Sequence, residues 1–154
     1  MTRNITINSG YFREAIMKKG LFAFIREIVE DYPNYDMYIK QRENEIMYRH
    51  QEFQDDNIGG GKAQNVRNES GEYEAITLAD DRYLNSLKRN ERAIEQALES
   101  SGVFTRDIIY ELYFRSNQRY TLDGLAEKIH FSRRKVINLR NDFFEDVAKR
   151  LGLL

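Results

Sequence analysis

The chain has 154 residues, a length that suits one compact domain or two small helical domains and excludes a large multidomain enzyme. It contains no cysteine, which excludes structural disulfides, thiolate zinc sites and cysteine nucleophiles. Its 24 Lys and Arg against 25 Asp and Glu give a formal net charge of -1, so any binding to nucleic acid must come from a local concentration of basic residues.

The composition favours helix over sheet, because the chain has a single proline and is rich in Glu, Lys, Arg and Leu. We therefore predict an all-α fold. No apolar run approaches the roughly 20 residues that a membrane-spanning helix needs, and the start, MTRNITINSGYFREAI, lacks the apolar core of a signal peptide. We expect a cytoplasmic protein with no membrane partner.

The first predicted region covers residues 1–53 and contains two helices. Apolar residues recur at helical spacing from Tyr11 to Asp31, which predicts an amphipathic helix with a possible break at Gly20. Pro33 ends this helix, because the residue before a proline is disfavoured in the helical conformation. Asn34 can then cap a second helix that runs to about Phe53.

A flexible linker is predicted over residues 54–73, where a glycine triplet and the NESGE segment interrupt the apolar periodicity. The GGGK sequence at Gly59 to Lys62 lacks the glycine spacing and the following Ser or Thr of a phosphate-binding loop, so we interpret it as part of this linker. From Glu74 to Ser100, apolar residues return at three- and four-residue steps and predict one long helix. The length of this helix suggests a strut or an association surface.

The last region, residues 101–154, contains three predicted helices. Thr105, Thr121 and Ser132 are natural N-caps, each followed by apolar residues at helical spacing. Only His130 and Phe131 separate the second helix from the third, so the two helices must cross at a steep angle. This arrangement predicts a helix-turn-helix.

The apolar residues of this region also fit a helix-turn-helix. Ala126 supplies the small residue that the contact between the two helices requires, and His130 stands at the turn position where glycine is common. Five further residues occupy the apolar places around the contact: Leu125, Ile129, Phe131, Val136 and Leu139.

The third helix carries the residues that would read DNA. At about 100° per residue, Arg134, Asn138 and Asn141 lie opposite its apolar face. Arginine can pair with guanine and asparagine with adenine through two hydrogen bonds, so Arg133, Arg134 and Asn138 are candidates for base reading. Lys135, Arg140 and Ser132 lie where phosphates would run. The candidate DNA-binding residues are Thr121, Ser132, Arg133, Arg134, Lys135, Asn138, Arg140 and Asn141.

Acidic residues limit the extent of this surface. Asp142, Glu145 and Asp146 follow on the same helix and would be repelled by phosphates, so only its first half can enter the groove. A different interpretation remains open, since a basic helix face is often only solvated and helix-turn-helix geometry also occurs in proteins that bind no DNA.

Catalytic or metal chemistry is not indicated. His50 and His130 stand alone, without an acid and a nucleophile nearby in sequence. Paired acids such as Asp55-Asp56 and Asp80-Asp81 are commonplace in caps and loops, and we do not interpret them as ligands of a metal ion. We expect neither an enzyme nor a bound cofactor or metal.

Two resemblances add to these patterns. The segment YTLDGLAEKIHFSRRKVINLRNDFFEDVAKRLGL resembles DNA-binding region four of bacterial sigma factors. The segments DYPNYDMYIKQRENEIM, NIGGG, AIEQAL and IIYELYF follow in the order seen in phage late-gene regulators of the RinA type, from about Asp31 to the end. This resemblance implies activation of phage packaging and structural genes. It assigns DNA reading to Ser132, Arg133, Arg134, Lys135 and Asn138.

The sequence thus predicts a sequence-specific transcription regulator that binds double-stranded DNA. We expect a homodimer, because small helix-turn-helix domains usually read two half-sites and the predicted helix from Glu74 to Ser100 offers a stripe for association. Two alternatives remain open. One is a phage DNA-packaging component such as a small terminase subunit, and the other is a protein-interaction module that docks on host RNA polymerase.

Overall fold

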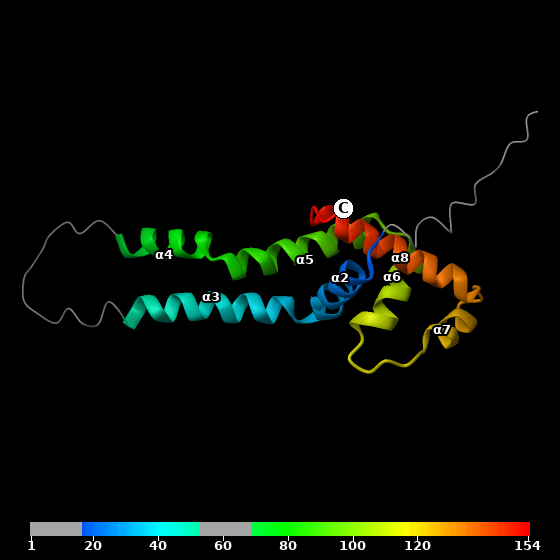
Figure 1. Ribbon diagram of the computed structural model, residues 1–154. Coiled ribbons are helices and arrows are strands. Elements are labelled where there is room, and N and C mark those ends of the chain that lie inside the picture. The colour runs from blue at the N-terminus through cyan, green and yellow to red at the C-terminus, as the bar shows by residue number, and fades with distance from the viewer. Residues whose placement is uncertain (1–16, 53–68) are drawn as a thin grey trace, which may run out of the picture. The chain divides into compact units, whose positions relative to one another are not determined.

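The computed structural model describes residues 17–52 and 69–154. These ranges contain helices and no strand, so the predicted all-α fold is confirmed. A 3₁₀ turn, η1, lies between the helices labelled α2 and α3, and a π-helical turn, η2, follows the helix labelled α6. The elements, most of them labelled in Figure 1, are α2 (Lys19–Asp31), η1 (Tyr32–Asn34), α3 (Tyr35–Glu52), α4 (Glu69–Asp80), α5 (Arg82–Ser100), α6 (Val103–Ile109), η2 (Tyr110–Phe114), α7 (Leu122–Lys128) and α8 (Arg133–Arg150).

The chain divides into two compact units. The terminal unit combines the residues up to Pro33 with those from Arg92 onwards, and the central unit covers Asn34–Glu91. Helix α2 therefore belongs to the same unit as α6, α7 and α8, although more than seventy residues of sequence separate it from them. The expected linker over residues 54–73 lies largely outside the described residues, and its end, from Glu69, belongs to α4.

Helix α2 contributes one face to the core of the terminal unit. Ile25, Ile28 and Val29 are buried, as their helical spacing predicts. The ring of Phe22 lies 5.1 Å, centroid to centroid, from that of Phe144 on α8. Gly20 lies within the first turn of α2 and does not break it, while the residues before Met17 lie outside the described ranges.

Pro33 separates α2 from α3, as the sequence predicts. Helix α2 ends at Asp31, the segment Tyr32–Asn34 forms η1, and α3 begins at Tyr35. The boundary between the two units falls at the same place, directly after Pro33.

The central unit is built from α3, α4 and the first part of α5. Its buried apolar residues come from α3 and α5 and are Tyr35, Ile39, Ile46, Leu84 and Leu87. Ion pairs join the same elements, with Arg42 Nη2 lying 2.8 Å from Asp81 Oδ2 and Lys88 Nζ lying 2.7 Å from Glu43 Oε1.

The prediction of one continuous helix from Glu74 to Ser100 is wrong, because α4 ends at Asp80 and α5 begins at Arg82. Asp81 stands between them and caps α5, since its Oδ1 accepts a hydrogen bond from the backbone N–H of Leu84 at 2.8 Å. The apolar stripe of α5 is also buried within the chain, with Leu84, Leu87 and Ile94 at 6 % exposure or less. That stripe is therefore not free to associate with a second molecule.

The predicted N-cap at Thr105 is also wrong. Helix α6 begins two residues earlier, at Val103, with Gly102 in the N-cap position. Thr105 lies inside the helix and is buried. A Thr near the start of a helix can stand at the N-cap or inside the first turn. The burial of the Thr105 side chain accompanies the second of these positions.

Candidate nucleic-acid interface

Two hydroxyl side chains set the starts of α7 and α8. Thr121 Oγ1 accepts a hydrogen bond from the backbone N–H of Gly124 at 3.2 Å, and Ser132 Oγ accepts one from the backbone N–H of Lys135 at 3.2 Å. Each bond satisfies an amide that a helix start leaves without a partner in the helix. The predictions of N-caps at Thr121 and Ser132 are confirmed.

Helices α6, α7 and α8 share one apolar cluster. Ile108, Leu125, Ala126 and Val136 are buried at its centre. Six partly buried residues pack against them: Leu112, Tyr120, Leu122, Ile129, Phe131 and Leu139. The prediction that Ala126 and the five apolar residues around it share a core is therefore confirmed.

The turn between α7 and α8 requires one unusual backbone conformation. His130 has φ of 57°, in the left-handed region that glycine adopts most easily. The backbone N–H of His130 bonds to the carbonyl of Glu127 at 3.2 Å, and that of Phe131 bonds to the carbonyl of Ala126 at 2.9 Å. This pair of bonds is a Schellman motif, which ends α7 and leads the chain into the start of α8.

Helix α8 separates an apolar face from a basic one. Val136, Phe143 and Val147 are buried, whereas Arg133, Arg134 and Lys135 in its first turn are exposed. Asn138, one turn further along, is half-buried. We call Arg133, Arg134, Lys135 and Asn138 the basic arc. These four residues are the part of the predicted site that the structure places together at the start of α8.

Arg133 is held by an acidic residue of α7. Its Nε lies 2.8 Å from Asp123 Oδ1, and the two side chains are 65 % and 68 % exposed. An ion pair this exposed contributes little to stability, so a phosphate or a guanine can replace the carboxylate at small cost. The sequence prediction missed Asp123, although an acid in the first turn of the preceding helix is the expected type of partner.

Arg140 and Asn141 lie farther along α8 than the basic arc, and Arg140 packs against α2. The Arg140 guanidinium is 5.2 Å from the centroid of the Phe22 ring. Its Nε and Nη2 donate to Asn141 Oδ1 at 3.0 and 2.7 Å, and both residues are half-buried. Burial raises the pKa of the neighbouring Tyr113, and Arg140 acts on that pKa in the opposite direction. Both side chains are thus engaged inside the terminal unit and are not part of the basic arc.

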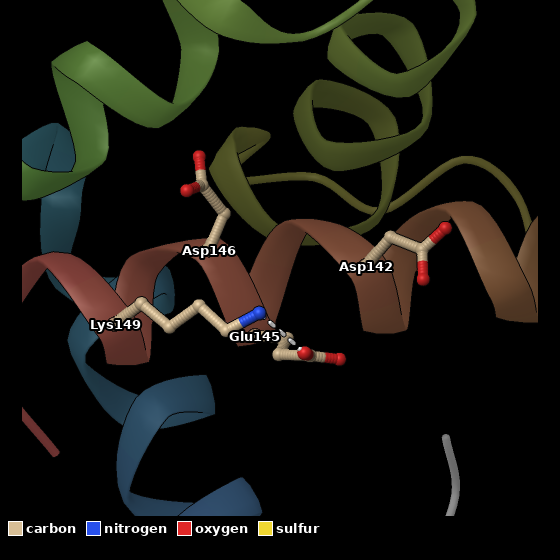
Figure 2. A pocket seen from close by; sticks show the side chains of 4 residues that line it. All are labelled: Asp142, Glu145, Asp146 and Lys149. Carbon is tan, nitrogen blue, oxygen red and sulfur yellow. Dashed lines mark hydrogen bonds and ion pairs between the residues drawn. The ribbon is translucent and has the colours of Figure 1, made fainter. Parts of the chain in front are cut away.

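The second half of α8 is acidic. Figure 2 shows the side chains of Asp142, Glu145, Asp146 and Lys149 along this helix, where they line a pocket. Lys149 Nζ pairs with Glu145 Oε1 at 2.6 Å, and Asp146 Oδ2 accepts from Arg150 Nε at 3.0 Å. A polyanion is attracted to the start of α8 and repelled by this later segment. The first turn of α8 therefore carries three exposed basic side chains, whereas the basic residues of its last turn, Lys149 and Arg150, are paired with acids.

Within residues 17–52 and 69–154, no group of three or more His, Cys, Asp or Glu side chains could hold a metal ion. In the same ranges, no helix is long and apolar enough to cross a membrane.

The fold and this surface define an all-α protein whose C-terminal helix presents an exposed basic arc. The chain belongs to the family described as "Protein of unknown function (DUF722)", whose model matches residues 24–149. That match runs through both compact units and includes the basic arc. No curated protein and no solved structure matches the chain.

Proposed function

We propose that this protein is a sequence-specific DNA-binding transcription regulator in which α7 and α8 act as a helix-turn-helix. The observation that carries the proposal is the basic arc. Arg133, Arg134 and Lys135 are exposed on the first turn of a helix whose opposite face is anchored in the core. A rigid helix that presents arginine and asparagine at its start has the chemistry needed to read base edges in the major groove.

Within this proposal, the residues of the basic arc have different roles. Arg134 and Asn138 are one helical turn apart, so they can reach neighbouring bases on one side of α8. Arg133 joins them when DNA replaces Asp123 as its partner. Lys135 and the capped start of α8, at Ser132, hold phosphates, and Thr121 does the same at the start of α7.

The resemblance to RinA-type regulators and to sigma-factor region four supports a more specific role. We propose that the protein activates late phage genes in the cytoplasm of a bacterial host. The acidic second half of α8 is consistent with helix docking by its N-terminal half. We also propose that the protein acts as a homodimer, because two half-sites give a small domain enough contacts for specific binding.

The proposal is tested by selection from a pool of random duplexes, followed by sequencing of the bound DNA. The wild-type protein should enrich one motif, and the variant Arg134→Ala/Asn138→Ala should lose that enrichment. A matched control is Arg89→Ala/Asn90→Ala on α5, which removes the same two residue types outside the basic arc. This control should enrich the wild-type motif. If the wild type enriches no motif, or if both double variants behave alike, the proposed DNA reading is wrong.

A further inference from the structure

The outer face of α3 carries a second seam opposite to its buried one. Tyr35, Ile39 and Ile46 are buried in the central unit. Met37 and Tyr48 fall on the other side of the helix wheel, and they are 57 % and 69 % exposed. Gln41 and Asn44 lie between them and are also exposed. The four residues Met37, Gln41, Asn44 and Tyr48 are called the outer seam.

The outer seam has the spacing of a coiled-coil contact. Its members follow one another at steps of four, three and four residues, which is the alternation of positions d and a in a heptad. All four are uncharged, although α3 as a whole is rich in charged residues. A polar residue at a single a position is a known means of fixing register and strand number at some cost in stability. Gln41 lies at position a, and Asn44 adds a second polar residue at position d.

The residues beside the seam indicate its partner. With Met37 at position d, Lys40 takes position g and Glu45 takes position e. In a parallel pair of helices, a g residue faces the e residue five positions later on the partner. Lys40 of one copy would therefore face Glu45 of the other, and the two-fold axis would repeat this contact. An antiparallel pair places Lys40 near Met47 and leaves these charges unmatched.

In a single copy, the side chains of Lys40 and Glu45 are exposed and form ion pairs within α3. The side chain of Lys40 is 70 % exposed and pairs with Asp36 on its own helix at 3.0 Å. The side chain of Glu45 is 45 % exposed and pairs with Arg42 Nη1 at 2.9 Å. Exposed pairs within a helix contribute little to stability, so they can be exchanged for pairs between copies.

We propose that the outer seam of α3 is the surface on which a second copy of this chain docks, as a parallel two-helix contact. The proposal rests on the proposed function, in which two copies read two half-sites. The outer seam takes the place of the α5 stripe as the association surface, because that stripe is buried inside the chain. The apolar surface for this contact is modest, because the described part of α3 exposes only three large apolar side chains, Met37, Met47 and Tyr48. The contact therefore belongs with weak interfaces, which form at high protein concentration or on a shared DNA site.

Single-cysteine crosslinking tests this arrangement directly, because the native chain has no cysteine to interfere. The variants Met37→Cys and Asn44→Cys, each oxidised mildly at high protein concentration without DNA, should form disulfide-linked dimers. Val103→Cys is the matched control, because Val103 is 62 % exposed on α6 in the terminal unit. It should stay monomeric under the same conditions. Equal crosslinking of all three variants, or of none, would overturn the proposal.

A mixture of Met37→Cys and Tyr48→Cys decides the orientation. A parallel seam gives dimers of each variant with itself, whereas an antiparallel seam gives only the mixed dimer and contradicts the proposal. Charge exchange is a second test. Lys40→Glu should weaken self-association in sedimentation experiments, and Lys40→Glu/Glu45→Lys should restore it. A double variant as weak as the single variant would contradict the predicted pairing.

These results can be separated from those on DNA binding. Enrichment of a two-fold symmetric DNA motif by a protein that does not crosslink through α3 would overturn the seam and leave the proposed function standing. Crosslinking through α3 by a protein that enriches no DNA motif would support the seam and contradict the proposed function.

Discussion

The replacement Ile25→Ala tests whether α2 folds with the helices that carry the basic arc. Ile25 is 0 % exposed and lies on the face of α2 that is buried in the terminal unit. Its neighbour Phe24 is 49 % exposed on the other side of the same helix. Phe24→Ala is therefore a matched control, because it removes a larger side chain from the same helix without emptying the core.

The expected magnitude follows from the burial. Truncating a fully buried isoleucine to alanine lowers the free energy of unfolding by about 2–5 kcal/mol, since the lost apolar contacts are added to the cost of a cavity. For a unit of this size, a loss of about 3 kcal/mol lowers the melting temperature by roughly 12–24 °C. Phe24→Ala should change the free energy of unfolding by less than about 1 kcal/mol.

The assay combines thermal unfolding, followed by circular dichroism, with hydrogen exchange read peptide by peptide. In Ile25→Ala, the amides of α8 should exchange faster than in the wild type, although the substitution lies in α2. This coupling is expected because elements of one cooperative unit lose protection together. If Ile25→Ala accelerates exchange only in α2 and leaves α8 at its wild-type rate, the assignment of α2 to the terminal unit is refuted.

Three further predictions concern single side chains. Ser132→Ala removes the cap of α8 and should lower the free energy of unfolding by about 1 kcal/mol, whereas Ser132→Thr should keep most of it, as measured by urea unfolding. His130→Gly should raise the melting temperature and His130→Val should lower it, because His130 holds φ of 57°; equal melting temperatures for the two variants would contradict this reading. The hydrogen bond from Arg42 lowers the pKa of Asp81, so the ionised carboxylate stabilises the fold above its ordinary pKa of about 4. This stability is lost as the pH falls through the lowered folded pKa, so the difference in urea midpoint between the wild type and Asp81→Asn should shrink below about pH 4 and stay constant at neutral pH.

Local signals in the sequence were sufficient for much of the terminal unit. Thr121 and Ser132 are followed at once by apolar residues at helical spacing, and both are caps in the structure. The apolar positions around Ala126 share one cluster because they lie within α7, the first half of α8 and the four residues that join these helices. Such contacts span few residues, so the helical period alone defines them.

Local signals were insufficient where competing choices lay within one or two residues. At Thr105 the hydroxyl is buried inside α6, and Gly102 takes the N-cap position. At Asp81 the prediction missed an N-cap. Its carboxylate both caps α5 and pairs with Arg42, and it divides what the apolar period alone predicts as one helix. An acid between two helical segments is compatible with either reading until its tertiary partner is known.

Contacts between distant segments could not be predicted. The packing of Phe22 against Phe144 joins residues more than a hundred positions apart, and the helical period carries no information about such pairs. The position of Arg140 on α8 suggests a place beside phosphates, because the sequence does not show that α2 packs there. Its guanidinium lies on the Phe22 ring instead, since α2 covers that side of α8. The role of Arg140 in DNA binding stays a prediction.

The central claim is that the basic arc reads DNA sequence, and competition binding tests it most directly. A labelled duplex carrying the selected motif is bound by the protein and displaced by the same motif or by a scrambled one. We predict that the wild type prefers its motif by at least about 1,000-fold and that Arg134→Ala/Asn138→Ala loses most of this preference while keeping weak, salt-sensitive binding. An equal preference in the wild type and the variant would contradict the account.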